Sequence, residues 1–214
     1  MLPSDYAERL TRLIADIDAG KWWIPPAVVG GIEGMTSKKI MAFLNGCLRA
    51  APDSTYLEVG VWKGKTFVAA IGGNGGIVRH AYAVDNWSEF GGPRTEFLQN
   101  LRFAVNPPPF TVIEKDCFTL TEQDIPESVD VFFYDGAHKQ EDQRRALTYF
   151  RPRLADRVLY MVDDWNNDFV QNGTRQGLVD GGYEVEWEAV RGQGQHNSHI
   201  EWWCGFYMAL LRKK

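Results

Sequence analysis

The order of apolar and polar residues changes about fifty residues into the chain. Residues 5–18 place apolar side chains at helical spacing, and residues 37–50 do so again, with Thr36 or Ser37 in position to cap the second helix. Between them the segment 21–26 reads Lys-Trp-Trp-Ile-Pro-Pro, which predicts an extended connection because a residue before proline disfavours helix. The first fifty residues therefore predict a helical extension.

Short apolar runs then alternate with helical patterns. The runs that predict strands are 56–59, 81–84, 110–113, 129–134 and 157–162, and the patterns that predict helices are 66–71, 93–105, 139–150 and 168–179. This alternation predicts a parallel sheet, and the nearly continuous apolar character of the strands indicates that helices cover both faces.

The chain ends in a different pattern. Residues 183–190 and 202–211 both predict strands, and the polar segment 192–199 links them without a helical pattern. We expect an antiparallel hairpin that closes a seven-stranded, mostly parallel sheet of the α/β class. Residues 1–50 would form an N-terminal helical extension or lid, and residues 51–214 one compact unit.

Composition narrows the function. The chain has 214 residues, of which 44% are hydrophobic and 24% charged, which excludes a disordered protein and suits one domain with an appended segment. The formal net charge of −5 lacks the basic surface of a general nucleic-acid binder, so we expect no nucleic-acid partner.

No apolar run reaches the roughly 18 residues of a membrane span, and the N-terminus lacks a signal-peptide core. Three widely spaced cysteines favour neither a disulfide framework nor structural zinc. We therefore expect a cytoplasmic protein without a membrane partner.

A carboxylate lies at or just after the end of every predicted parallel strand. Because ligands of such sheets bind at the carboxyl ends of the strands, these residues are the candidates for a site, although a single Asp there can simply cap a helix. In chain order they are Glu58, Asp85, Asp116, Asp135, Asp163 and Asp164, accompanied by Gly60, Gly64, Cys117 and His138.

The glycine turn after the first strand does not fit two common kinds of nucleotide-binding site. Gly60-Val-Trp-Lys-Gly64-Lys65-Thr66 is one residue too short for a P-loop, and it lacks the G-x-G-x-x-G fingerprint of dinucleotide binding. Asp85 ends the next strand, where an acidic residue can accept both hydroxyls of a ribose. A nucleoside without a pyrophosphate is the expected ligand.

These motifs resemble those of the class I S-adenosylmethionine-dependent methyltransferases, whose first motif is an acidic residue followed by G-x-x-x-G. The resemblance implies a Rossmann-like sheet and S-adenosylmethionine as cofactor. It implies that Glu58 and the glycine turn hold the methionine end, that Asp85 binds the ribose, and that Asp116 and Cys117 lie near the adenine. The implied cofactor-binding residues are Glu58, Gly60, Trp62, Gly64, Asp85, Asn86, Trp87, Asp116, Cys117 and Asp135.

A second group of residues predicts a metal. Asp135, Asp163 and Asp164 end two strands that should be neighbours, and three carboxylates suit Mg²⁺ or a similar divalent cation. The D-G-x-H run and the acidic pair resemble the metal-dependent O-methyltransferases of small molecules and macrolide sugars. That resemblance implies that His138 is the general base, with Asp135 beside it. A solvated acidic loop and an exposed histidine at a helix start are the plainer alternatives.

The expected activity is methyl transfer from S-adenosylmethionine to a hydroxyl of a small molecule of sugar or natural-product type, assisted by Mg²⁺. Three alternatives stay open: a methyltransferase of this fold without a metal, an enzyme of this fold with a hydroxylase-like reaction, and a non-catalytic nucleoside-binding protein. The expected partner is a small hydroxyl acceptor, and a homo-oligomer is possible.

Tryptophan is unusually frequent, with eight in the chain. We expect Trp62, Trp87 and Trp165 to lie on site loops, where an aromatic face can stack on the ligand or attract a sulfonium. Three more, at 187, 202 and 203, would pack on the closing hairpin. Those at 22 and 23 would pin the N-terminal helix, with a lid over the site as the alternative.

Overall fold

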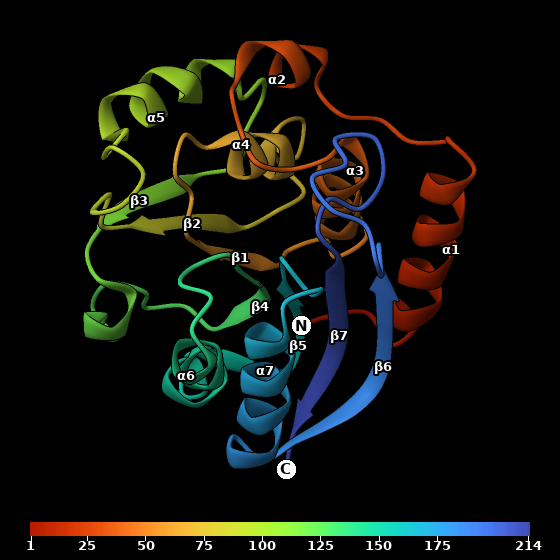
Figure 1. Ribbon diagram of the computed structural model, residues 1–214, viewed down its shortest axis with the longest axis vertical. Coiled ribbons are helices and arrows are strands. Elements are labelled where there is room, and N and C mark those ends of the chain that lie inside the picture. The colour runs from red at the N-terminus through yellow and green to blue at the C-terminus, as the bar shows by residue number, and fades with distance from the viewer.

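The computed structural model describes all residues, 1–214, as seven helices around a seven-stranded sheet (Figure 1). The helices are α1 (Tyr6–Asp18), α2 (Pro26–Gly31), α3 (Lys38–Arg49), α4 (Lys65–Ile71), α5 (Arg94–Asn100), α6 (Gln140–Phe150) and α7 (Asp168–Asp180). The strands are β1 (Thr55–Val59), β2 (His80–Asp85), β3 (Phe110–Glu114), β4 (Val129–Tyr134), β5 (Leu154–Val162), β6 (Tyr183–Arg191) and β7 (Phe206–Lys213). None of the helices combines the length and the apolar character needed to cross a bilayer.

The sheet has the order β3-β2-β1-β4-β5-β7-β6. The first five strands in this order are parallel, and β7 runs antiparallel between β5 and β6. The predicted Rossmann-like α/β fold with a C-terminal hairpin is confirmed. The direction of winding reverses between β1 and β4, which is where ligands of such sheets bind.

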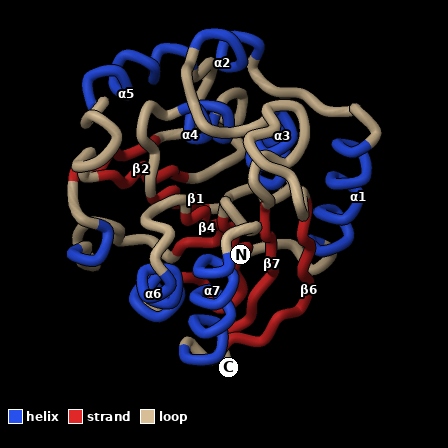
Figure 2. The backbone as a smooth tube through the Cα atoms, viewed as in Figure 1, coloured by secondary structure: helices blue, strands red, loops and turns tan.

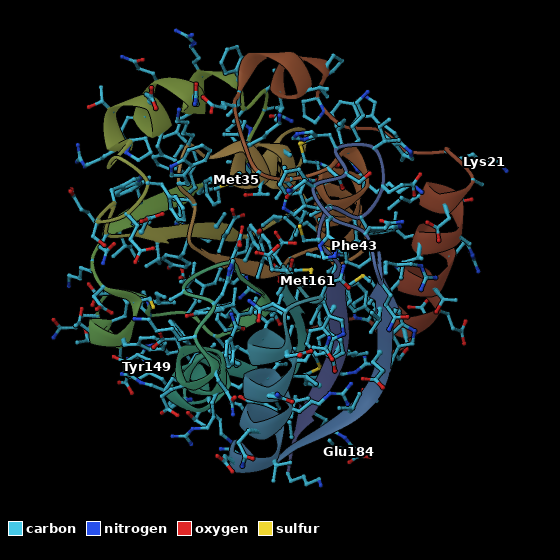
Figure 3. The ribbon with its side chains drawn as sticks, in the orientation of Figure 1. Lys21, Met35, Phe43, Tyr149, Met161 and Glu184 are labelled. Atoms are coloured by element: carbon cyan, nitrogen blue, oxygen red, sulfur yellow. The ribbon has the colours of Figure 1, made fainter.

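Two hydrophobic layers cover the sheet, because successive side chains of a strand point to opposite faces. One layer joins α1, α3 and α4 to residues such as Phe133 and Met161, and the other joins α6 and α7 to Phe132 and Tyr160. Phe43 on α3 and Met161 on β5 both belong to the first layer (Figure 3). Figure 2 shows the strands between these groups of helices.

The N-terminal segment packs on this same core. Ser37 caps α3 by accepting a hydrogen bond from the Ile40 amide at 3.2 Å, as the sequence predicts. The buried Tyr6 hydroxyl of α1 donates to the Cys47 carbonyl at 2.9 Å. Helices α1 and α3 thereby become part of the layer that covers the first face of the sheet.

Four expected boundaries differ from the structure. The segment expected to be extended, 21–26, is non-helical up to residue 25, and no pattern predicts the short helix α2 that begins at Pro26. The predicted helix 93–105 is α5 followed by a 3-10 turn at 101–103. Strand β5 begins at Leu154 rather than residue 157. Strand β7 begins only at Phe206, so Trp202 and Trp203 lie in the preceding loop rather than on a strand.

Candidate active site

A cavity of about 520 Å³ opens at the carboxyl ends of β1 to β5. This volume lies in the ordinary range for a small-molecule site. Most of the predicted site residues line it, namely Gly60, Trp62, Asp85, Asn86, Trp87, Asp116, Cys117, Asp135, His138, Asp163 and Asp164. Glu58 and Gly64 do not.

Gly60 brings the turn after β1 against the end of β4. It has a φ of +87°, and a Cβ placed there would lie 2.0 Å from the backbone oxygen of Asp135. Only glycine fits this approach and this conformation. At Gly60 the bare backbone of the turn therefore lies between β1 and β4, where the direction of winding of the sheet reverses.

Asp85 joins two loops at the cavity. Its carboxylate accepts hydrogen bonds from the Trp62 amide at 2.8 Å and from the Trp87 amide at 2.7 Å. The Trp87 indole donates to the Trp62 carbonyl at 2.9 Å. Because each carboxylate oxygen can accept a further hydrogen bond, Asp85 can fix these loops and still bind a hydroxyl pair.

Glu58 is fully buried behind the cavity wall, not exposed to a ligand. The hydroxyls of Tyr56 and Thr66 each donate to its carboxyl group at 2.6 Å. Burial raises the pKa of Glu58 to about 8, against the effect of these two hydrogen bonds.

Gly64 and Asp116 have local structural contacts. A Cβ on Gly64 would lie 2.8 Å from the Phe97 ring, so this glycine admits α5 to the core. Asp116 accepts a hydrogen bond from the Phe118 amide at 2.8 Å, which caps the 3-10 turn at 117–119. Asp116 lines the cavity all the same.

His138 lies between two carboxylates where β4 and β5 end. Its Nδ1 is 3.1 Å from Asp164 Oδ2, and its Nε2 is 3.8 Å from Asp135 Oδ1. Both carboxylates favour the imidazolium and raise the pKa of His138, Asp135 most strongly although Asp164 makes the shorter contact. The side chain is 37% exposed, so it can meet a ligand in the cavity.

The three aspartates crowd one another. Burial raises the pKa of Asp135 to about 6 and the pKa of Asp163 well above its ordinary value, and the neighbouring carboxylates add to both shifts. Buried Oδ1 atoms of Asp163 and Asp164 have no hydrogen-bond partner. In the present side-chain positions, no group of three or more His, Cys, Asp or Glu residues is arranged to hold a metal ion.

Comparison with protein families identifies the chain. The family described as "Methyltransferase domain" matches residues 57–165, which is more than half of the 214 residues. The chain belongs to this methyltransferase family. It is an S-adenosylmethionine-dependent methyltransferase with the fold described above. No curated protein matches its sequence.

Solved structures share the fold of this methyltransferase at low sequence identity. Cofactor-bound Rv0187 from MTB aligns with a TM-score of 0.62 at 15% identity over 97% of this chain and 91% of its own. An O-methyltransferase from Bacillus cereus in complex with SAH aligns with a TM-score of 0.59 at 13% identity, over 98% and 92%. A precorrin-6y C5,15-methyltransferase from Geobacter metallireducens aligns with a TM-score of 0.56 at 16% identity, over 82% and 89%.

The methyltransferase cavity also includes residues that no motif indicated. Met35 comes from the N-terminal segment, and Asn197, Trp203 and Cys204 come from the loop between β6 and β7. The sequence favoured an ordinary hairpin loop at 192–199 over a loop that caps the site, whereas the longer loop 192–205 does reach the cavity. The only signal for it was the polar stretch with Asn197, which many surface loops share.

Not every tryptophan expected at the site lines the cavity. Trp62 and Trp87 line the cavity, but Trp165 is buried and stacks on Tyr207 with ring centroids 4.2 Å apart. Trp22 and Trp23 do not line the cavity. Trp23 lies beside the end of α3, with the Arg49 guanidinium 6.0 Å from its ring.

Proposed function

We propose that this methyltransferase transfers the methyl group of S-adenosylmethionine to a hydroxyl oxygen of a small molecule. The observation that carries the proposal is His138, held between the carboxylates of Asp135 and Asp164 on the cavity wall. An alcohol must lose its proton as it attacks the methyl carbon, so a base at this point has a function.

The contacts of His138 suit a general base. Nδ1 lies 3.1 Å from Asp164 Oδ2, and a hydrogen bond from Nδ1–H to that oxygen would leave Nε2 as the basic atom of the neutral ring. As Nε2 takes the alcohol's proton, the two carboxylates stabilise the imidazolium that forms. Asp135 and Asp164 act on the imidazole in the way the carboxylate of a catalytic triad does.

We propose Mg²⁺ as a cofactor, held by Asp135, Asp163 and Asp164. The crowding of these carboxylates supports a cation, as do the buried oxygens of Asp163 and Asp164 that lack a partner. Three hard oxygen donors fit a hard divalent ion. Such an ion, when bound, lowers the pKa of an alcohol.

The donor would occupy the part of the cavity near Asp85. There the carboxylate can accept hydrogen bonds from ribose hydroxyls, and Asp116 and Cys117, which line the same cavity, would lie beside the adenine. The backbone turn at Gly60 leaves room for the methionine end. Positioning of donor and acceptor in line then supplies much of the rate.

Chelation separates the two forms of this proposal. We expect EDTA to abolish methyl transfer to a hydroxyl acceptor, as measured by formation of S-adenosylhomocysteine, and Mg²⁺ to restore it. Full turnover in EDTA would instead favour the metal-independent methyltransferase, in which Asp135 and His138 work alone. The present arrangement of the side chains is the observation that keeps this second candidate.

Replacement of His138 tests the base. We expect His138→Gln to lower kcat by roughly 10²–10⁴-fold, as is usual for loss of a general base. The affinity for S-adenosylhomocysteine, measured by calorimetry, should stay within about twofold because His138 contacts the acceptor side. An unchanged kcat would remove His138 from the mechanism.

A further inference from the structure

The cavity divides into two sides across β4. Residues after β1, β2 and β3 line one side, and these are the proposed contacts of the donor. The other side lies beyond β4, at the end of β5 and the start of the antiparallel β7. Asp135 and His138 stand at the boundary, where a methyl group would pass from donor to acceptor.

Two segments far apart in the sequence complete the lining of the cavity. Met35 comes from the connection between α2 and α3 (Figure 3), and Asn197, Trp203 and Cys204 come from loop 192–205. We call these four residues the acceptor wall. Loop 192–205 crosses in front of α3 in Figure 1, where it meets the N-terminal segment.

Hydrogen bonds fix the start and the middle of loop 192–205, which carries three of the four residues of the acceptor wall. The Asn166 side chain donates to the carbonyls of Gly192 at 2.9 Å and Gln195 at 2.7 Å. The His199 carbonyl accepts a hydrogen bond from the Lys38 amide at 3.1 Å. The Nδ1 atom of the His199 ring lies 3.1 Å from the Thr36 carbonyl oxygen. The wall is thus a preformed surface tied to the N-terminal segment, rather than a free loop.

Trp203 supplies the aromatic surface of the wall. It has a φ of +51°, unusual for a large side chain, and is only 8% exposed. The His199 ring packs against it with centroids 4.7 Å apart. Backbone strain and packing together hold this indole at the cavity, where it can stack on a flat face of a ligand.

The charge of the lining limits what can bind beside Trp203. Seven carboxyl side chains line the cavity, against one lysine, Lys115, and no arginine. Lys115 is paired with Asp124 at 2.5 Å and lies on the donor side. With all seven carboxyl groups ionised, the charges of Lys115, a protonated His138, a divalent cation and a sulfonium would still leave the lining negative. The acceptor wall itself has no positively charged side chain that could neutralise an anion.

We propose that the acceptor wall binds a ring-shaped acceptor that is neutral or cationic and stacks on Trp203, and that it rejects acceptors bearing a carboxylate or phosphate. This inference rests on the proposed function for its reaction, but the binding that it predicts can be measured without methyl transfer.

The test uses three probes with one scaffold and different charge: phenyl β-D-glucopyranoside, phenyl β-D-glucosaminide and phenyl β-D-glucuronide. Each is titrated by calorimetry into the protein loaded with S-adenosylhomocysteine. We expect the neutral and amino probes to bind at least about tenfold more tightly than the glucuronide. Trp203→Ala should weaken their binding by roughly tenfold, the loss expected for one aromatic contact, and Trp203→Phe should restore most of it.

Two further variants keep the result interpretable. Trp23→Ala removes a tryptophan outside the cavity and should leave all affinities unchanged. Met35→Ala truncates a half-exposed wall residue, and it should weaken the neutral probe even where Trp203→Ala does not fold. Affinity for S-adenosylhomocysteine should be the same in every folded variant.

Glucuronide binding as tight as that of the neutral probe would overturn the charge selection. Unchanged binding in both Trp203→Ala and Met35→Ala, or no binding of any probe, would overturn the acceptor wall. The reaction itself is assessed separately: probes that bind as expected and are never methylated support the wall and count against the proposed oxygen methylation.

Discussion

Glu58 carries a carboxyl group inside the protein, one residue before the end of β1. Its surroundings provide two hydroxyl donors and no cation, and burial raises its pKa to about 8. At neutral pH this side chain is therefore mostly protonated. Its part in the site is to support the turn after β1 from behind, because Thr66 binds it from the first turn of α4.

This carboxyl group makes stability fall as pH rises. Between its ordinary pKa of 4.5 and about 8, the folded protein holds a proton that the unfolded chain releases. The free energy of unfolding then decreases by up to roughly 1.4 kcal/mol per pH unit from this group alone. Below pH 4.5 both states are protonated, and above about 8 both are ionised, so the dependence disappears.

Glu58→Gln should remove that dependence while it keeps the shape of the side chain. We expect the variant to gain stability over the parent protein from pH 5 to pH 8, as measured by urea unfolding at both values. Glu122→Gln, at an exposed position outside the cavity with no side-chain ion pair, serves as the matched control and should follow the parent. Parallel pH curves for Glu58→Gln and parent would contradict a protonated Glu58.

For single residues, the sequence predicts that those at the strand ends meet in a site. It does not predict that the residues of the acceptor wall reach the same cavity. Asp135, His138, Asp163 and Asp164 meet because their strands are neighbours, which the alternation of elements already implies. Asn197 and Trp203 reach the cavity through the path of a long loop. That path depends on contacts with Asn166 and Thr36, which no local pattern encodes.

Among the elements, α3 and α4 are joined by one buried side chain. The Asn45 amide donates to the carbonyls of Ala69 at 2.8 Å, Ala70 at 3.2 Å and Gly72 at 2.8 Å. These carbonyls belong to the end of α4, where helical partners run out. The N-terminal segment thereby completes the helix that follows the glycine turn of β1.

Asn45→Ala should cost about 2 kcal/mol of stability, because it leaves buried carbonyls without donors. Chemical unfolding measures the loss, and Asn172→Ala on the exposed face of α7 is the matched control, with a change within about 0.5 kcal/mol. Equal stability of the two variants would show that water or a neighbouring group satisfies those carbonyls.

The errors in the predicted bounds of β7 and in the missed helix α2 have physical causes. The run 202–211 is apolar throughout, which favours a strand, but Gly205 has a φ of +93° and Trp203 a φ of +51°. These conformations end a strand, and they put both tryptophans in the loop. Helix α2 has six residues and two glycines, too short for a helical period to appear.

At the scale of the whole molecule, one core joins the N-terminal helices to the sheet. The hydrophobic layer that contains Phe43 of α3 continues through Phe67 of α4 to Phe133 of β4. Ligand binding at the carboxyl ends of the strands should therefore stabilise the entire chain and not one part of it.

S-adenosylhomocysteine at about 100 times its Kd should raise the free energy of unfolding by roughly 2.7 kcal/mol. We expect one cooperative transition, with near- and far-ultraviolet circular dichroism changing together. In Asp85→Asn the same ligand concentration should give a smaller shift, because the ribose loses its charged acceptor. Two separate transitions, or an undiminished shift in that variant, would contradict these expectations.

The division of the cavity across β4 has a consequence for how such a protein diversifies. The region shared with the methyltransferase family, 57–165, contains the proposed donor contacts, His138 and all three aspartates. Every residue of the acceptor wall lies outside it, in segments before and after. If the two proposals hold, separate stretches of one chain carry the chemistry and the choice of substrate. Exchange of loop 192–205 between relatives should then change the acceptor while the residues that bind the donor stay the same.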